Sequence, residues 1–241
     1  MVMAWLTLAA VALLTFLMGS VPWGLVISKV FYHKDLRNEG SGNIGTTNAM
    51  RSMGKVGGSA VFVLDFGKGI VSGLIGVGLA NVLFSQDPQA CASLLFLAPG
   101  TSIVSMSSLE PIHAFFVSLA TAVAFLGCTL GHIFSPWLGF KGGKGIAVAA
   151  GCLFVTFGFV GGLIEILIFA VLVIATRYVS VGSLAAAIVC PFLAIYYCHG
   201  NILSWVCCFL GAAMVIWAHR SNIQRLIGGC ERRIGDKKKA A

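Results

Sequence analysis

The sequence predicts an all-α integral membrane protein with seven transmembrane helices, and three observations lead to this fold class. Of the 241 residues, 58% are hydrophobic and 10% are charged, whereas an ordinary soluble domain has roughly 45–50% apolar and about 25% charged residues. Apolar runs close to the roughly twenty residues that cross a bilayer recur along the chain. The basic residues collect between these runs, as the positive-inside rule describes.

The first apolar run, about residues 3–28, is expected to cross the membrane as a helix and not to be removed as a signal peptide. Residues 1–18 contain no Lys or Arg, whereas a secretory signal peptide begins with a basic segment. The run also continues past Pro22 and Trp23 to Phe31, which is too long for the apolar core of a signal peptide.

Six further spans follow along the chain. Four apolar runs of suitable length predict one helix each, over about residues 56–80, 111–133, 181–198 and 201–218. The stretch 145–176 is too long for one upright helix, and Gly158, Gly161 and Gly162 interrupt its middle. Two short helices over 145–157 and 160–176 are therefore expected. The segment 81–110 is expected to be an external connection, in which the apolar residues 91–98 are too few to cross.

The distribution of basic residues tests this count and orients the chain. Seven spans place the segments 29–55, 134–144, 177–180 and 219–241 on one side of the membrane. These segments hold all of the 16 Lys and Arg residues except Lys68, and the opposite segments hold none. Six spans would move the basic tail to the other side. The rule then puts the N-terminus outside and the C-terminus in the cytoplasm, in a single membrane domain over 1–241.

The composition also excludes several kinds of partner. The formal net charge of +8 comes from residues between apolar runs, so no nucleic-acid partner is expected. The eight cysteines form no C-x-x-C motif, and most lie inside apolar runs, where Cys packs as a small hydrophobe. We therefore expect no disulfide framework, no metal site and no cofactor.

Three polar segments, over 32–55, 134–144 and 219–231, interrupt the apolar pattern on the predicted cytoplasmic side. In the first, Gly40, Gly42 and Gly45 match the spacing G-x-G-x-x-G, but no strand precedes them, so a dinucleotide site is not expected. Arg51 offers a fork suited to phosphate or carboxylate. Short polar side chains precede it: Ser41, Asn43, Thr46, Thr47 and Asn48. The alternative is a solvated turn rich in helix caps.

The second segment leads into a glycine-rich turn, Gly142, Gly143, Lys144 and Gly145, at the start of the helix expected from 145. It differs from a P-loop, because three residues separate Gly139 from Gly143 and because Gly follows the Lys. Free N–H groups and the helix dipole beside an ammonium group still predict an anion site. The alternative is that Lys141 and Lys144 only anchor a helix end at the interface.

The third segment holds His219, Asn222 and Arg225 at spacings of three residues. If the last span continues as a helix, the members of each successive pair are neighbours. The alternative is a basic tail attracted to anionic lipid. That alternative accounts for the three lysines at 237–239, but gives no reason for a His and an Asn.

Two acidic residues and one lysine lie inside predicted spans. Asp65 and Lys68 are three residues apart, and an internal ion pair is favoured over direct contact with a substrate. Glu165 has no partner nearby in the sequence, so packing against a polar group of another helix is favoured over a role in a proton path.

Together, the segments GSGNIGTTNAMR, GHIFSPWLGFKGGKG and HRSNIQRL resemble the motifs of the bacterial acyl-phosphate:glycerol-3-phosphate acyltransferases. The three motifs occur in the same order, and the hydrophobic spacing matches over nearly the whole chain. The resemblance implies a seven-span enzyme of the bacterial inner membrane. Such an enzyme transfers a fatty acyl group from acyl phosphate to the primary hydroxyl of glycerol 3-phosphate, giving lysophosphatidic acid in phospholipid synthesis. Thr46 and Val148 depart from the family, which often has Ala and a nearby Thr there.

The residues agree with this chemistry. Both substrates carry a phosphate, and an acyl phosphate is already activated, so no strong protein nucleophile is required. Neither G-x-S-x-G nor a His followed five positions later by Asp occurs. The expected catalytic residues are His219, Asn222, Lys144 and Ser41. The expected substrate-binding residues are Arg51, Asn48, Lys141, Gly142, Gly143, Gly145, Asn43 and Thr47.

Within this set, Lys144 and its glycine turn are expected to hold the acyl phosphate and to stabilise charge on the carbonyl oxygen. Arg51, with Asn48 and Lys141, is expected to hold the phosphate of glycerol 3-phosphate. His219 is a candidate general base oriented by Asn222. In the other route, the phosphate of the donor takes the proton and His219 only positions a substrate. The sequence leaves both routes open.

A transporter of phosphorylated small molecules is the competing class. Transporters place their sites near the bilayer midplane, often between internal repeats, whereas here the polar residues gather at one surface and no repeat occurs. A structural scaffold would have no need of three glycine-rich basic segments. We therefore expect an enzyme that functions as a monomer, with acyl phosphate, glycerol 3-phosphate and membrane lipid as its partners.

Overall fold

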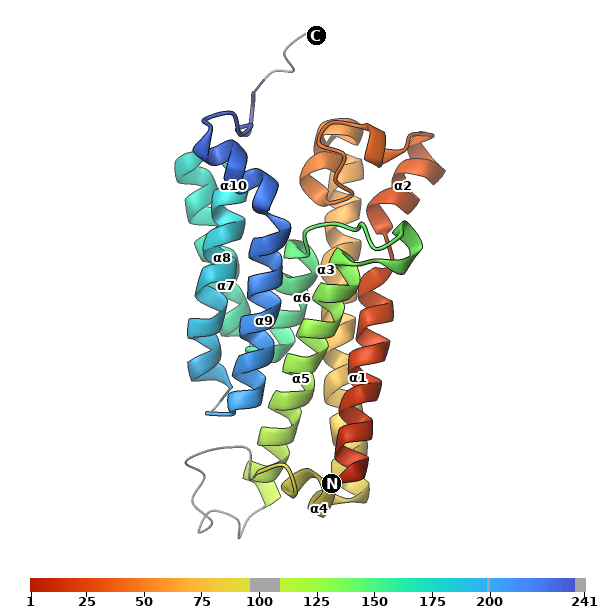
Figure 1. Cartoon of the computed structure of the whole chain (residues 1–241), viewed down its shortest axis with the longest axis vertical. Helices are drawn as coiled ribbons and strands as arrows, with labels where there is room; N and C mark the ends of the chain where they lie inside the picture. The colour runs from red at the N-terminus through yellow and green to blue at the C-terminus, as the bar shows by residue number, and fades with distance from the viewer. Residues whose placement is uncertain (96–108, 199, 237–241) are drawn as a thin grey trace.

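The computed structural model describes residues 1–95, 109–198 and 200–236, and within these ranges the regular elements are helices. Figure 1 shows most of the long helices running side by side along the long axis of the molecule. The α-helices are α1 (Val2–Ser20), α2 (Trp23–Tyr32), α3 (Thr46–Gln86), α4 (Pro88–Ala92), α5 (Leu109–Ile133), α6 (Ile146–Thr156), α7 (Gly158–Thr176), α8 (Val179–Tyr197), α9 (Ile202–Ala218) and α10 (Arg220–Ile227). Two short 3-10 helices are η1 (Leu36–Asn38) and η4 (Pro136–Leu138).

Helix α5 organises the bundle. It packs against α1, α3, α6 and α9, and Phe116, Leu119 and Phe125 on it are buried. Glycines let neighbouring backbones approach closely: a Cβ at Gly131 would overlap the carbonyl oxygen of Phe16, and one at Gly151 would overlap that of Phe66. Close packing at small residues is a common way for membrane helices to associate.

Large apolar side chains cover much of the outer surface. On α7, for example, Phe159, Leu167, Val171 and Ile174 are exposed. A soluble monomer rarely exposes an extended apolar surface of this kind. The outer face of the bundle is therefore suited to contact with lipid hydrocarbon.

Each predicted apolar run contains a helix, and the first run contains two. The predicted span 3–28 lies within the segment Val2–Tyr32, which is long and apolar enough to cross a membrane, but α1 stops at Ser20 and α2 begins at Trp23. Pro22 lies at this break, where its missing N–H cannot continue the hydrogen bonds of a helix. The prediction of two short helices over 145–176 is confirmed, with Gly158 (φ 69°) at the junction of α6 and α7.

Three regions expected outside the membrane spans are helical. Residues 46–55 form the first turns of α3, residues 81–86 form its last turns, and most of 219–231 forms α10. Helix α3 tolerates polar residues at its start, because side chains there lie beside backbone N–H groups that lack helical partners. Within α3, Gly54 has φ 76° and kinks the helix. The predicted apolar segment 91–98 extends beyond residue 95, outside the described residues.

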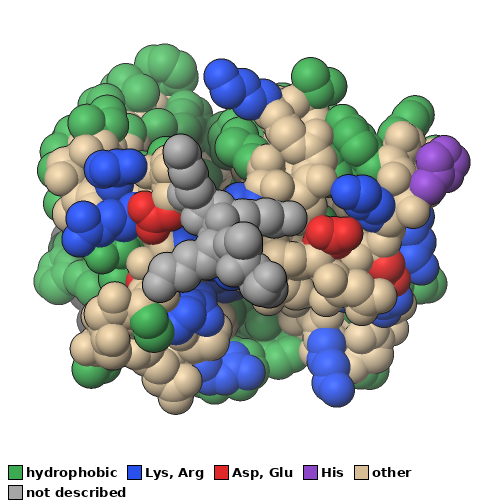
Figure 2. All heavy atoms as spheres, turned by 90° about the horizontal axis from the view of Figure 1, so that it is seen from above, with side chains coloured by type: hydrophobic (Ala, Val, Ile, Leu, Met, Phe, Trp, Pro, Cys, Tyr) green, Lys and Arg blue, Asp and Glu red, His purple; other side chains and the backbone are tan. Residues whose placement is uncertain are grey.

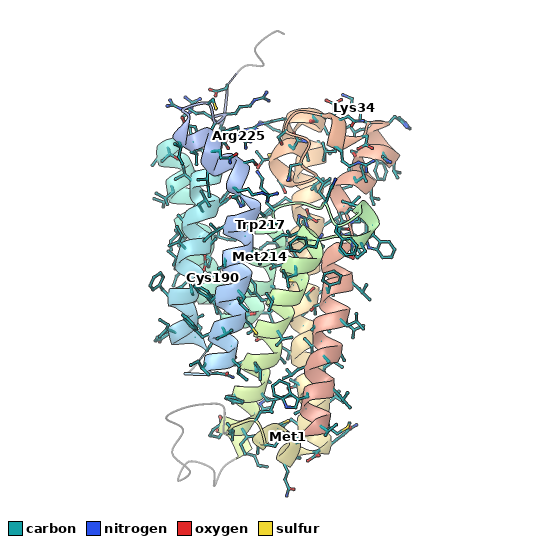
Figure 3. All side chains as sticks on the ribbon, in the orientation of Figure 1. Met1, Lys34, Cys190, Met214, Trp217 and Arg225 are labelled. Carbon is teal, nitrogen blue, oxygen red and sulfur yellow. The ribbon has the colours of Figure 1, made fainter. Side chains whose placement is uncertain are left out.

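Among the described residues, five segments can cross a membrane by length and composition, or six if α9 and α10, which are bent by 54°, count as one span. Helix α6 is apolar but has only 11 residues. Met1 lies at one end of the bundle, whereas Lys34 and Arg225 lie at the opposite end (Figure 3). The end that carries Lys34 and Arg225 is called the motif end below.

Candidate active site

Residues of all three polar segments line one cavity of about 780 Å³. The cavity extends from the level of Arg225 at the motif end to that of Cys190, further along the bundle (Figure 3). Figure 2 shows the motif end from above, with Lys and Arg side chains distributed over it and few acidic side chains among them. The polar lining residues include Ser41, Asn43, Thr46, Thr47, Asn48, Arg51, Lys144, His219, Asn222, Arg225 and Glu231.

Asn48 shapes the first segment. Its side chain is 2% exposed, and its Oδ1 accepts a hydrogen bond from the backbone N–H of Ser41 at 2.9 Å. Its amide nitrogen donates to the carbonyl oxygens of Leu36, Glu39 and Asn43 at 3.2, 2.9 and 2.8 Å. The expected contact between Asn48 and a phosphate is therefore revised, because its amide group already holds the loop together.

Other residues of this segment stay available to a ligand. Asn43 Oδ1 accepts from Gly45 N–H at 2.9 Å, immediately before α3. The buried Thr46 Oγ1 has no hydrogen-bond partner among the described residues, and Thr46 lines the cavity. Arg51, in the second turn of α3, is exposed at the cavity, and no described carboxylate forms an ion pair with it. Arg51 is thus the cation of this segment that can meet an anion.

The glycine turn of the second segment folds back onto the end of α5. Gly142 N–H donates to Ile133 O at 2.9 Å, and Gly143 N–H donates to His132 O at 3.0 Å. A Cβ on either glycine would overlap His132, at its carbonyl oxygen or at its Nε2. The expectation that these two amides face an anion is therefore wrong. The free N–H groups at the start of α6 remain available to bind an anion.

Lys144 lies at the start of α6, between this turn and the cavity. It is partly buried, and the burial lowers its pKa to about 8, with the nearby charges of Arg225 and Arg51 adding to the shift and Glu231 opposing it. Gly145 precedes α6 with φ 86°, a left-handed conformation that glycine adopts without strain. Lys141, in contrast, is exposed and is not among the cavity residues, so its predicted contact with substrate is not supported.

His219 stands at the bend between α9 and α10. It is 2% exposed, and its Nδ1 lies 2.8 Å from Val215 O. A carbonyl oxygen only accepts hydrogen bonds, so Nδ1 carries a proton, and in the neutral imidazole Nε2 keeps its lone pair. His219 lines the cavity, which makes this nitrogen a candidate acceptor for a substrate proton.

Glu231 is a site residue that the sequence prediction missed. Its Oε1 accepts from Asn222 Nδ2 at 2.7 Å, and its Oε2 pairs with Arg225 Nε. Burial opposes ionisation of Glu231, but the hydrogen bonds from Asn222 and Arg225 outweigh it and hold the pKa below its usual value. Asn222 Oδ1 is buried without a partner among the described residues. The one signal in the sequence was a single carboxylate next to a basic segment.

A buried network of Asp65, Lys68 and His132 packs against the glycine turn. Lys68 Nζ lies 2.8 Å from Asp65 Oδ1 and 3.0 Å from His132 Nδ1, and it donates to Val21 O at 2.8 Å. The ion-pair interpretation of Asp65 and Lys68 is thus confirmed. Because Gly143 packs against the ring of His132, the network also fixes the turn that precedes Lys144.

Away from the motif end, the cavity walls are mainly apolar. They come from α5 to α9 and include Phe125, Leu153, Phe169, Ala187, Cys190 and Ala212. In the described part of the chain, no group of three or more His, Cys, Asp and Glu side chains is placed to hold a metal ion. The cavity therefore combines a cationic end with an apolar extension.

Comparisons with known proteins agree on one family. The family profile described as glycerol-3-phosphate acyltransferase matches residues 9–229. A glycerol-3-phosphate acyltransferase of Rhodopseudomonas palustris is 34% identical over 229 residues, covering 95% of this chain and 96% of its own length. One of Rhodospirillum rubrum is 36% identical over 240 residues, covering 98% and 95%.

Two solved structures are also similar. Both are crystal structures of PlsY, an integral membrane glycerol 3-phosphate acyltransferase. The glycerol 3-phosphate form has a TM-score of 0.71 and 31% identity, covering 95% of this chain and 96% of that chain. The lysophosphatidic acid form has a TM-score of 0.69 and 29% identity, covering 95% of each.

Proposed function

The chain belongs to the glycerol-3-phosphate acyltransferase family, and from this premise we propose that it transfers a fatty acyl group from acyl phosphate to the primary hydroxyl of glycerol 3-phosphate. The products are lysophosphatidic acid and phosphate. One observation carries the proposal: three polar segments far apart in the sequence converge on one cavity with a cationic end and an apolar extension. Those two parts match a pair of phosphates and one acyl chain.

Two cationic side chains bind the two phosphates, one each. Lys144 and the free N–H groups at the start of α6 hold the phosphate of the donor, because a helix N-terminus beside an ammonium attracts an anion. Arg51 holds the phosphate of glycerol 3-phosphate through its guanidinium fork. Ser41, Asn43 and Thr47 line the same cavity as Arg51 and offer further hydrogen bonds.

In the reaction, the primary hydroxyl attacks the acyl carbonyl carbon, a new C–O bond forms, and the bond to phosphate breaks. Lys144 stabilises the negative charge on the carbonyl oxygen and the departing phosphate. The hydroxyl proton passes either to Nε2 of His219 or to an oxygen of the leaving phosphate. Asn222 Oδ1, buried without a described partner, accepts a hydrogen bond from the substrate and orients it.

For the membrane arrangement we propose seven spans, including the short α6, in the bacterial inner membrane. The N-terminus is outside, and the motif end faces the cytoplasm. The separation of Met1 from Lys34 and Arg225 supports an odd number of crossings (Figure 3), and the basic residues of the motif end support its orientation. The substrates then reach the cavity from the cytoplasm, and the product stays in the lipid. We propose that the monomer is active, since all three segments meet within one chain.

The test is an assay of the purified protein in detergent with acyl phosphate and labelled glycerol 3-phosphate. We expect labelled lysophosphatidic acid, and the Lys144→Ala protein serves as the control for activity of this site. Detergent leaves no compartment to cross, so product formation separates an enzyme from a transporter. Acyl-CoA and acyl-carrier protein, tested in parallel, should be poorer donors. Activity with either of these, but none with acyl phosphate, would overturn the assignment of the donor.

A further inference from the structure

Glu165 is a buried carboxyl that the proposed reaction does not use. It lies on α7, is 3% exposed and lines the cavity. Its Oε1 has no hydrogen-bond partner in the part of the chain that the structure describes. The expectation that another helix provides a polar partner for it is therefore not met at this oxygen.

The cavity wall formed by α6, α7 and α8 is mainly apolar. Leu153 of α6, Phe169 of α7, and Ala187 and Cys190 of α8 line the same cavity. A buried polar group that makes no hydrogen bond costs several kcal/mol by transfer scales. Ser183 of α8 also lines the cavity, but its hydroxyl donates to Val179 O at 3.0 Å. Oε1 of Glu165 is thus buried in a mainly apolar wall without a hydrogen-bond partner among the described residues.

Its position is beyond the phosphate sites, along the apolar extension. Gly162 packs against Phe154 in the antiparallel pair of α6 and α7, which places Glu165 about level with Ala150, another cavity residue. Ala150 is one turn into α6, roughly 6 Å of helix rise beyond Ile146. An acyl chain held by its phosphate at Lys144 would pass Glu165 several carbon atoms from its carbonyl group.

On the basis of the proposed function, we propose that Glu165 is a recognition point for a hydroxyl group carried by the acyl chain. A methylene chain cannot pair with the carboxyl. A hydroxyl both donates and accepts, so it satisfies the carboxyl in either protonation state. An uncharged hydroxyl also suits the apolar wall better than a cation, whose desolvation would be costly. A site that hydrogen-bonds a substrate hydroxyl discriminates against the analogue that lacks it.

The test compares acyl phosphates of one chain length, unsubstituted or carrying one hydroxyl at successive positions, in the detergent assay. We expect kcat/KM of the native enzyme to be about tenfold higher for one mid-chain hydroxyl position than for the unsubstituted donor, as one buried hydrogen bond allows. In Glu165→Leu the ratio should fall to about one, with a faster reaction of the unsubstituted donor. Glu165→Gln keeps a hydrogen-bonding group and should retain part of the preference. Glu110→Gln changes an exposed carboxyl at the other end of the bundle and should keep all of it.

The outcomes separate this inference from the proposed function. If no donor yields lysophosphatidic acid, the proposed function fails. If donors with and without the hydroxyl react equally well at every position in the native enzyme, the recognition role of Glu165 fails while the acyltransferase activity stands. This comparison requires no variant, so poor folding of Glu165→Leu would not obscure it. A preference that survives in a folded Glu165→Leu protein would also overturn the inference.

Discussion

Lys144 is the residue on which the phosphate chemistry depends most directly. Its ammonium lies at the start of α6, partly buried and facing the cavity. Lys144→Ala removes a charge-assisted contact worth roughly 1.5–3 kcal/mol, so kcat/KM for acyl phosphate should fall by at least tenfold. Lys144→Arg should not restore full activity, because the planar fork is larger than the ammonium for which the glycine turn leaves room. Near-native turnover of a folded Lys144→Ala protein would exclude this residue from the site.

The same residue predicts an alkaline limb in the pH profile. Because burial lowers the pKa of Lys144 to about 8, the ammonium is present below that pH and is lost as the pH rises through it. Phosphate binding weakens with the loss, so kcat/KM for acyl phosphate should decline above about pH 8, after subtraction of uncatalysed hydrolysis. In Lys144→Arg the guanidinium stays charged, and this limb should disappear. An identical limb in both proteins would assign it to another group.

His219 distinguishes the two routes for the proton. A general base typically contributes about 100- to 10,000-fold and gives an acidic limb in the pH–rate profile. The activated donor favours the route in which phosphate takes the proton. We therefore expect His219→Ala to be severely impaired, whereas His219→Asn and His219→Gln keep measurable activity with the acidic limb still present. Loss of that limb, together with full loss of rate in all three variants, would make His219 the base.

At the scale of elements, the pair Asp65 and Lys68 on α3 makes a prediction about stability. Lys68→Met leaves the Asp65 carboxyl buried without its ion pair, which should cost about 3–5 kcal/mol of unfolding free energy. The double variant Asp65→Asn with Lys68→Met removes both charges and should recover part of that loss. Thermal unfolding in detergent measures both, and Lys55→Met, an exposed change on the same helix, is the control. Equal stability of Lys68→Met and Lys55→Met would contradict a structural role for the pair.

The elements also show what a sequence can and cannot predict for such a chain. The helices could be predicted because a bilayer requires long apolar segments with internally satisfied backbones. The bend at Pro22 and the early start of α3 at Thr46 could not, since both depend on local geometry within segments that are read as uniformly apolar or polar. Polar composition alone favoured a loop over 46–55, although its residues form helical turns.

In the site, composition predicted which segments converge but not how each side chain is used. Asn48 looked like a phosphate ligand because amides bind phosphate, yet its partners are carbonyls up to 12 residues away in the chain. The amides of Gly142 and Gly143 looked free, but they bond to the end of α5. Pairing of Glu231 with Asn222 depends on where the chain turns after α10. Hydrogen bonds of this kind depend on tertiary contacts that residue spacing does not encode.

The whole bundle is predicted to have one orientation in the membrane. A single site requires that all three polar segments face the same compartment, and the positive-inside rule makes it the cytoplasm.

Cys230 is the exposed cysteine of the native chain. In a Cys230→Ser background, new cysteines at Lys34, Lys141 and Asp236 should react with an impermeant thiol reagent only when the cytoplasmic face is open. A cysteine at Gln89, beyond the far end of α3, should react in intact cells. The native chain should label at Cys230 from the cytoplasmic face alone, which provides an internal control. Labelling of Lys34 and Lys141 from opposite faces would place Arg51 and Lys144 in different compartments and would contradict the single site.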